Sequence, residues 1–280
     1  MSSIRQENLK YDIMKKIKIV FIALLWVPLI LNAQEDSVEL FTVPLSNPGS
    51  SGKLIVEQLA GSIDVMAYEG AEVIVKASFG NDNRRKDKKE KDGLKRIENS
   101  SMKISAEEKN NTVQIINEQW NKPTNLEIKV PVNFSLKLGT VNKGNITVHG
   151  VKGEFEISNV NGEITVEDVS GSVSADTVNG DIKVNFISVN SGASMAFSSM
   201  NGDLEVTFPS TTKADLKLKS EMGDIFTDFD MALDKQKPVV DKNNSGGKYK
   251  VKIEQWVNGS INGGGPEMLF KTFNGYIIFR

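Results

Sequence analysis

The sequence predicts an all-β protein, a parallel β-solenoid of short strands, on the strength of three observations. Glycine recurs at a spacing of nine residues, apolar residues stand two and four positions after most of these glycines, and equivalent residues return every 18 positions. Each unit then consists of a tight turn followed by a short strand with one apolar face. One such unit cannot bury its apolar face alone, whereas stacked units form a continuous core.

The composition of the 280-residue chain supports this class and excludes several chemistries. Aromatic residues make up 7% and glycines number 23, which favours short strands and turns over thick helices. The absence of cysteine excludes disulfides, cysteine-ligated zinc and thiol catalysis. The single histidine, His149, excludes a multi-histidine metal site and is expected to be structural. We predict no metal and no cofactor, and the net charge of −2 gives no indication of nucleic-acid binding.

Residues 1–33 are expected to be an export signal rather than part of the fold. Met14 is the expected true start, and lysines follow it before the apolar run 19–31 and a small residue, Ala33, at the cleavage point. The run has 13 residues, which is too short to span a bilayer as a helix. The mature chain is therefore predicted to be periplasmic, attached to the cell surface or secreted, with an uncleaved N-terminal anchor as the alternative.

The repeat organises residues 34–280 as a single domain. Its template identifies these structural turn glycines: Gly144, Gly153, Gly162, Gly171, Gly180, Gly202, Gly223 and Gly275. Ile146, Ile164 and Ile182 are 18 residues apart, so a chain that makes one circuit of two nine-residue sides would stack them about 4.8 Å apart. Asn-Gly between alternating apolar residues is also a strong hairpin signal, which leaves an antiparallel meander or sandwich as the alternative.

Two stretches interrupt the repeat and are expected to be loops that leave the stack. Residues 81–98 form a charged insertion, and residues 234–247 are polar and rich in turn-forming side chains. Within the insertion, the basic loop 84–96 carries side chains that could attract an anionic polymer or lipid headgroup. Interspersed acidic residues and the lack of an aromatic side chain for base stacking favour a solvated loop.

The Val-Asn-Gly-Asp/Glu-Ile units resemble the bacterial putative adhesins built from β-strand repeats, a family with a domain-of-unknown-function label that is similar to auto-transporter adhesin heads. Residues 160–164 and 178–182 and the closing segments 262–265 and 273–277 carry the resemblance, which extends over about residues 50–280. It implies a right-handed β-solenoid in the bacterial envelope, with no catalytic residue and no defined ligand. The charged insertion 81–98 departs from the family pattern.

Acidic residues follow several of the turn glycines, and stacking would bring them to one edge. The members of this candidate ion-binding edge are Glu163, Asp181, Asp203 and Asp224. Carboxylate oxygens suit Ca²⁺, but the ion requires six or more converging oxygens, which a column of single side chains does not supply. A solvated turn is the favoured interpretation of these residues.

Two tryptophans, Trp120 and Trp256, stand in similar Glu-Gln-Trp segments and are candidates for stacking on sugar rings. Tryptophan is usually buried on average, so closure of the ends of the stack is the favoured role.

The sequence predicts an exported, non-enzymatic envelope protein whose long regular side binds a glycan or a protein partner. Motifs for a phosphate loop or a serine nucleophile elbow are absent from the sequence, and no residue is predicted to be catalytic. The alternative is a periplasmic structural or signalling accessory that binds an envelope protein by strand addition. A polysaccharide-active enzyme is disfavoured because no cluster of Asp, Arg and Lys is evident, and self-association through the solenoid ends is a further expectation.

Overall fold

The computed structural model describes residues 38–80, 90–91, 94–95, 102–120, 122–234, 239–245, 248–254 and 256–280. The predicted export signal 1–33 and most of the charged insertion 81–98 lie outside the described residues. Residues 36–280 form a compact unit. All the described elements are β-strands, which confirms the predicted fold class.

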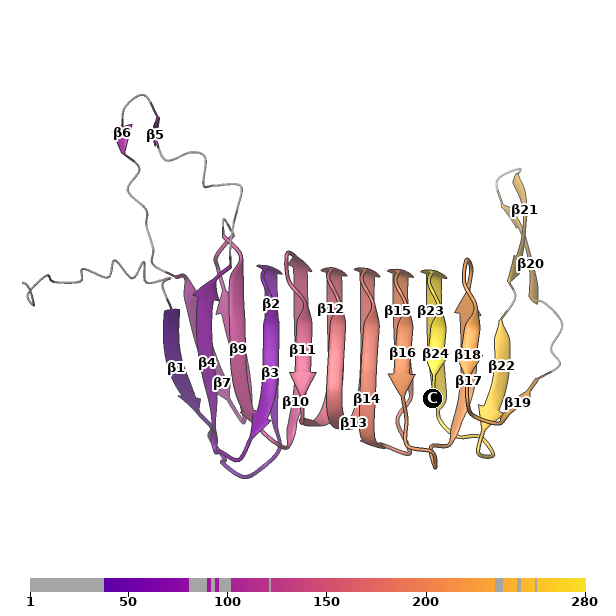
Figure 1. Ribbon diagram of the computed structural model, residues 1–280, viewed down its shortest axis with the longest axis horizontal. Coiled ribbons are helices and arrows are strands. Elements are labelled where there is room, and N and C mark those ends of the chain that lie inside the picture. The colour runs from indigo at the N-terminus through magenta and orange to yellow at the C-terminus, as the bar shows by residue number, and fades with distance from the viewer. Residues whose placement is uncertain are drawn as a thin grey trace, which may run out of the picture. The chain divides into compact units, whose positions relative to one another are not determined.

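Twenty of the strands belong to one sheet that bends back on itself through β13 and so forms two facing layers (Figure 1). In layer 1 the strands follow each other in space as β7 (Ile104–Lys109), β8 (Thr112–Asn117), β2 (Gly52–Ala60), β10 (Phe134–Asn142), β12 (Lys152–Asn161), the second half of β13 (Ile164–Asn179), β15 (Met195–Asn201), β23 (Glu267–Asn274), β17 (Ala214–Ser220), β22 (Val257–Ile261) and β19 (Met231–Leu233). In layer 2 the order is β1 (Val38–Pro44), β4 (Glu72–Phe79), β9 (Thr124–Pro131), β3 (Ile63–Tyr68), β11 (Ile146–His149), the first half of β13, β14 (Ile182–Val189), β16 (Leu204–Thr207), β24 (Ile277–Phe279) and β18 (Ile225–Thr227).

The middle of the stack has the predicted 18-residue circuit. Ile146 lies beside Ile164 and Ile164 beside Ile182, all in parallel pairing, and Phe155 lies beside Val173. In this register, residues 18 positions apart in the sequence lie side by side in neighbouring rungs. The parallel pairing rules out an antiparallel meander for these rungs. One rung thus consists of a layer 1 strand, a glycine turn and a layer 2 strand.

Stacked apolar columns between the two layers form the core. One column, fully buried, contains Ile63, Ile146, Ile164, Ile182, Leu204 and Ile277. Alternation along each strand sends one set of side chains to this core and the next set to the surface. Each layer therefore has an outer face whose side chains form rows across the strands.

Both ends of the stack depart from sequence order. The rung first in sequence, β2–β3, lies between β8–β9 and β10–β11, so it is one rung inside the end. The last rung, β23–β24, lies between β15–β16 and β17–β18. Antiparallel strands complete the two ends, with β7, β4 and β1 at one and β22 and β19 at the other.

Two short hairpins lie in the segments that were expected to be loops. β5 (Glu90–Lys91) pairs with β6 (Leu94–Lys95) inside the charged insertion. β20 (Val239–Ser245) pairs with β21 (Lys248–Glu254), which corrects the prediction of a simple loop at 234–247. Alternating apolar residues in Tyr249-Lys-Val251-Lys-Ile253 are the sequence signal for the second hairpin.

Candidate binding face

The turn glycines divide between the two edges of the stack. Six of them form a column that we call the glycine edge, namely Gly144, Gly162, Gly180, Gly202, Gly275 and Gly223. A Cβ on any of these would collide with the carbonyl oxygen of the glycine one rung away, starting from Gly61. Gly153 and Gly171 lie on the opposite edge. Close approach between backbones therefore accounts for glycine in this column.

Hydroxyl and amide groups, all buried except that of the half-buried Ser220, line the glycine edge on its inner side. Thr140, Asn159, Thr177, Ser199, Thr272 and Ser220 each donate a hydrogen bond of 2.8–3.1 Å to the carbonyl of a turn glycine in the preceding rung. These carbonyls belong to the turn between the two strands of a rung. They point along the stack and have no backbone N–H of a neighbouring strand as a partner. The donors satisfy groups that would otherwise be buried without a partner.

An asparagine ladder lines the same edge on its outer side. Asn142, Asn161, Asn179 and Asn201 lie in successive rungs, and each amide nitrogen donates to the preceding amide oxygen at 2.8–2.9 Å. Asn274 occupies the same register in the next rung. Neither ladder was predicted from the sequence, although from Gly162 onwards polar residues recur one and three positions before most of these turn glycines.

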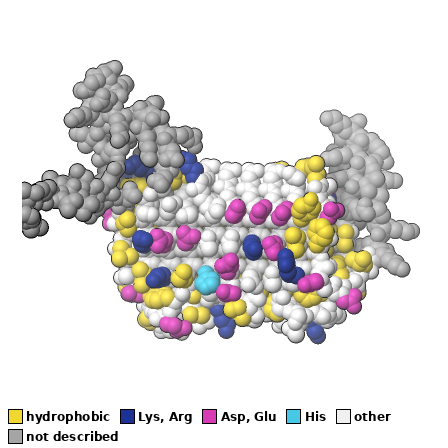
Figure 2. All heavy atoms as spheres, viewed as in Figure 1, with side chains coloured by type: hydrophobic (Ala, Val, Ile, Leu, Met, Phe, Trp, Pro, Cys, Tyr) yellow, Lys and Arg dark blue, Asp and Glu magenta, His cyan; other side chains and the backbone are white. Residues whose placement is uncertain are grey.

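The candidate ion-binding edge lies just beyond the glycines, where Glu163, Asp181 and Asp203 occupy successive rungs. Tyr276, from the inserted last rung, separates Asp203 from Asp224. Figure 2 shows the row of acidic side chains, interrupted by hydrophobic side chains before its last member. Asp181 Oδ1 accepts a hydrogen bond from the Asp203 N–H at 2.8 Å, and Asp203 Oδ1 accepts one from the Tyr276 N–H at 2.7 Å. These carboxylates thus cap backbone donors of the next rung.

Within the described residues, no group of three or more histidine or acidic side chains is placed to hold a metal ion. His149, on the outer face of layer 2, has its Nδ1 3.8 Å from Asp168 Oδ2, which is too long for a hydrogen bond. The described residues also contain no helix of the length and hydropathy needed to cross a bilayer.

The two tryptophans are far apart. Trp120 follows β8 near one end of the stack, and 79% of its surface is exposed. Trp256 precedes β22 at the other end, where the ammonium groups of Lys217 and Lys219 lie 4.8 and 5.5 Å from its ring centre. Seven strands of layer 1 separate β8 from β22, so the two rings are about 35–40 Å apart and cannot stack on the same sugar.

A row of apolar side chains runs across the outer face of layer 1, beside the glycine edge. We call it the apolar stripe, and its members are Leu59, Val141, Val160, Val178, Met200 and Phe273. Leu59, Met200 and Phe273 have 58%, 54% and 50% of their surfaces exposed, and Val178 has 38%. At the opposite edge, the equivalent Val151 and Val169 are fully buried. Position relative to glycine therefore does not by itself decide which valines enter the core.

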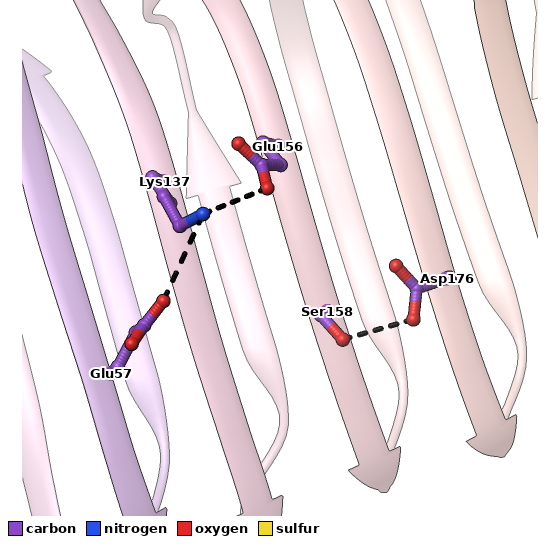
Figure 3. Close-up of polar contacts among 5 residues, drawn as sticks. All are labelled: Glu57, Lys137, Glu156, Ser158 and Asp176. Carbon is purple, nitrogen blue, oxygen red and sulfur yellow. Dashed lines mark hydrogen bonds and ion pairs between the residues drawn. The ribbon is translucent and has the colours of Figure 1, made fainter.

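A groove of about 430 Å³ lies along the stripe, over β2, β10, β12 and β13. Gly139, which has no side chain, forms part of its floor, and Glu57, Lys137, Glu156, Ser158 and Asp176 line it. Lys137 Nζ is 2.9 Å from Glu156 and 4.0 Å from Glu57, while Ser158 donates to Asp176 at 2.9 Å (Figure 3). The hydrogen bond and charge of Glu156, with a smaller contribution from Glu57, raise the pKa of Lys137.

A second hollow, of about 610 Å³, adjoins the groove and shares Glu156 with it. Polar side chains from β2, β10, β12 and β13 predominate in its lining, including Lys53, Ser135, Glu154 and Ser172. Hydroxyl, carboxylate and ammonium groups on a flat face can hydrogen-bond a polar ligand such as a glycan.

The structure thus defines a parallel β-solenoid with interleaved ends and a hollowed outer face. The family model described as Toastrack DUF4097 matches residues 134–262, which confirms the expected resemblance to a β-strand repeat family of unknown function. None of the curated proteins matches the chain.

Three solved structures are similar to this chain. A "putative cell adhesion protein" from Clostridium sporogenes is 14% identical, with 87% of this chain and 98% of that chain covered and a TM-score of 0.43. A "putative adhesin" from Bacteroides fragilis is 11% identical, with 87% and 97% covered and a TM-score of 0.38. A "putative adhesin" from Parabacteroides distasonis is 10% identical, with 88% and 98% covered and a TM-score of 0.24.

Proposed function

We propose that the protein is an exported, non-enzymatic envelope protein of the adhesin type, which binds a partner surface through the outer face of layer 1. The observation that carries the proposal is the pair of adjoining hollows on that face, beside the exposed apolar stripe. Exposed apolar side chains bordered by polar groups are typical of interaction surfaces. The lysines after Met14, the short apolar run 19–31 and Ala33 support export from the cytoplasm.

The larger hollow is suited to a glycan because its lining is rich in hydroxyl groups. Ser135 comes from β10 and Ser172 and Ser174 come from β13, on either side of β12, and Lys53, Glu154 and Glu156 add charges of both signs. Sugar hydroxyls both donate and accept hydrogen bonds, so a lining that offers both is complementary to them. Several weak contacts of this kind, spread over stacked strands, would give affinity without a deep pocket.

The test is a glycan array probed with the exported protein, in calcium and in chelator, beside a matched pair of variants on β13. Ser172→Tyr fills the hollow, whereas Thr165→Tyr places the same ring on the outer face of layer 2. The expected result is binding that Ser172→Tyr abolishes and Thr165→Tyr leaves intact. Loss of binding in chelator together with Asp181→Asn would instead assign it to the acidic edge. A signal that Trp120→Ala or Trp256→Ala removes would indicate stacking on a sugar ring.

Strand addition is the second candidate, and the end strands favour it. The described pairings of β1 are with β4 alone, and Leu40 on β1 has 68% of its surface exposed. An unpaired strand edge offers backbone groups to another chain. A Leu40→Pro variant that no longer recovers an envelope partner, with the glycan array unchanged, would support this mode.

A further inference from the structure

The outer face of layer 1 is complementary to itself, and this inference rests on the proposed role of that face in binding. Rows of side chains beside the apolar stripe differ in charge along the stack. In the half that contains β2, β10, β12 and β13, the two rows next to the stripe carry Glu57, Lys137, Glu156 and Asp176, a net charge of −2. On the other side of β13 the same rows carry Lys271 on β23 and Lys217 and Lys219 on β17. Lys271 lies opposite the acidic side chains in the arrangement proposed below, whereas β17 lies outside it.

We propose that the partner of the apolar stripe is a second copy of this chain, bound face to face about a two-fold axis parallel to the strands between β12 and β13. This axis reverses the order of the strands in the second copy but leaves the position along each strand unchanged. Each row of side chains therefore faces the same row of the second copy. An interface of this kind uses the same patch on both copies, so every contact occurs twice.

The registers show which residues would meet across this axis. In the stripe, Leu59 faces Phe273 of the second copy, Val141 faces Met200, and Val160 faces Val178. In the next row, Glu57 faces Lys271 of the second copy and Ser158 faces Asp176. One row further, Ile55 faces Leu269, and both side chains are half-buried in the single chain. Apolar groups therefore meet apolar groups and Glu57 meets an opposite charge, whereas Lys137 and Glu156 face Ala196 and Ser174 of the second copy.

The size of the face is sufficient for a stable dimer. Six strands at about 4.8 Å span about 29 Å along the stack, and the seven residues from Lys53 to Leu59 of β2 span about 23 Å along the strands. This corresponds to about 650 Å² from each copy and about 1,300 Å² in total, within the range of specific interfaces.

The test is sedimentation velocity over a dilution series of the exported protein and three charge variants. E57K and K271E each place like charges opposite one another, so each is expected to weaken the dimer at least about tenfold. The double variant E57K/K271E exchanges the two charges and is expected to restore the affinity to within about threefold of the original. E167K, a charge reversal on β13 at the outer face of layer 2, serves as the matched control and is expected to leave the dimer unchanged.

Several outcomes would overturn the inference. A protein that remains monomeric at about 100 µM, or a dimer that neither single variant weakens, means that this face is not the interface. Failure of the double variant to recover the dimer would overturn the proposed register. The dimer would cover the hollow lined by Ser135 and Ser172, so the glycan array is probed at a concentration at which the protein is monomeric. A glycan signal from the monomer that Ser172→Tyr removes supports the proposed function whatever the dilution series shows, and a blank array from the monomer contradicts the proposed function alone.

Discussion

The middle and the two ends of the stack follow different rules. From β10 to β16 the order of the strands in space is their order in the sequence, and each circuit adds one rung. At either end the first or last rung of the sequence is inserted one position inwards, and antiparallel strands from the intervening segments lie outside it (Figure 1). The middle is thus a simple repeat, whereas each end is an interleaved structure.

This difference shows how a repeat protein can avoid exposing its end rungs. A regular solenoid leaves a parallel edge at each end, which needs a cap to prevent pairing with another chain. Here the inserted rungs are held on both sides, and three of the four outermost strands, β7, β1 and β19, run antiparallel to their neighbours. The fourth, β18, pairs in parallel with β24. Residues 267–279 therefore form an internal rung, and this end of the stack cannot form without them.

Deletion of residues 267–280 is expected to have the largest effect, because it removes a rung from inside the stack. Met268, Phe270, Ile277 and Phe279 are all fully buried, and burial of such side chains contributes about 1.5–3 kcal/mol each. The total is comparable to the whole stability of a domain. Circular dichroism is expected to show no cooperative thermal transition in the truncated protein.

Replacement of residues 236–255 with a Gly-Ser linker is the matched control for this deletion. β20 and β21 pair with each other in a sheet of their own, so this variant should keep its transition. A truncated protein that unfolds cooperatively at the original temperature would show that the last rung is an appendage instead of an internal element.

A substitution at the glycine edge should be less damaging than the deletion but larger than any surface change. In Gly180→Val the new side chain would meet the Gly162 carbonyl, and the rungs would have to separate. We expect a loss of about 3 kcal/mol in the free energy of unfolding, measured by urea denaturation. The control is Gly192→Val, because the nearest atom to a Cβ at Gly192 is Asn190 Oδ1 at 3.8 Å. Equal effects at the two positions would contradict close packing as the reason for the glycine column.

The sequence was sufficient to predict the middle of the stack but not its ends. The 18-residue spacing of Ile146, Ile164 and Ile182 specifies both the face and the neighbouring rung. The segment 273–279 has the same template as the middle rungs, yet it lies between β16 and β18. Periodicity identifies the core-facing side chains in the strand that follows each turn glycine, but it contains no information about which rung a distant segment joins.

The candidate site was predicted only as an extended surface. Val160 and Val178 have the same place in the template as Val151 and Val169, but the first pair is on the outer face and the second is in the core. The reason is that the two edges of the rung differ in backbone path, which the nine-residue spacing does not reveal. The groove over Gly139 depends on neighbours from three strands, so sequence alone could not locate it.

A smaller effect is expected from the inner polar ladder of the middle rungs. In the unmodified protein the Thr177 hydroxyl donates a hydrogen bond of 3.1 Å to the Gly162 carbonyl. Thr177→Val keeps the shape of the side chain but removes this donor. A buried acceptor without a partner costs about 1–3 kcal/mol, and we expect a value near the lower limit because one hydroxyl is lost. Ser174→Ala, at an exposed position of the same strand, is the control and should change stability by less than about 0.5 kcal/mol. If both variants unfold at the same urea concentration, the ladder does not contribute to stability.

The smallest effect should be a pH-dependent change confined to the end that contains β7 and β8. Glu108 accepts hydrogen bonds from the Ser46 hydroxyl and backbone N–H and from the Asn111 N–H, and these bonds lower the pKa of its carboxyl group. A lowered pKa in the folded state means that the contact stabilises the fold above the ordinary pKa of glutamate and is lost as the pH falls through the lowered value.

The measurement for this last prediction is an NMR titration of the Ser46 and Asn111 amide resonances. Both should shift together with a midpoint below that of an ordinary glutamate, while the Gly162 and Gly180 amides of the middle rungs should not follow the same curve. In Glu108→Gln the shared transition should disappear, since the amide side chain does not titrate. A shared transition that survives in Glu108→Gln would assign it to another group. Separate midpoints for Ser46 and Asn111 would mean that one carboxylate does not hold the two segments together.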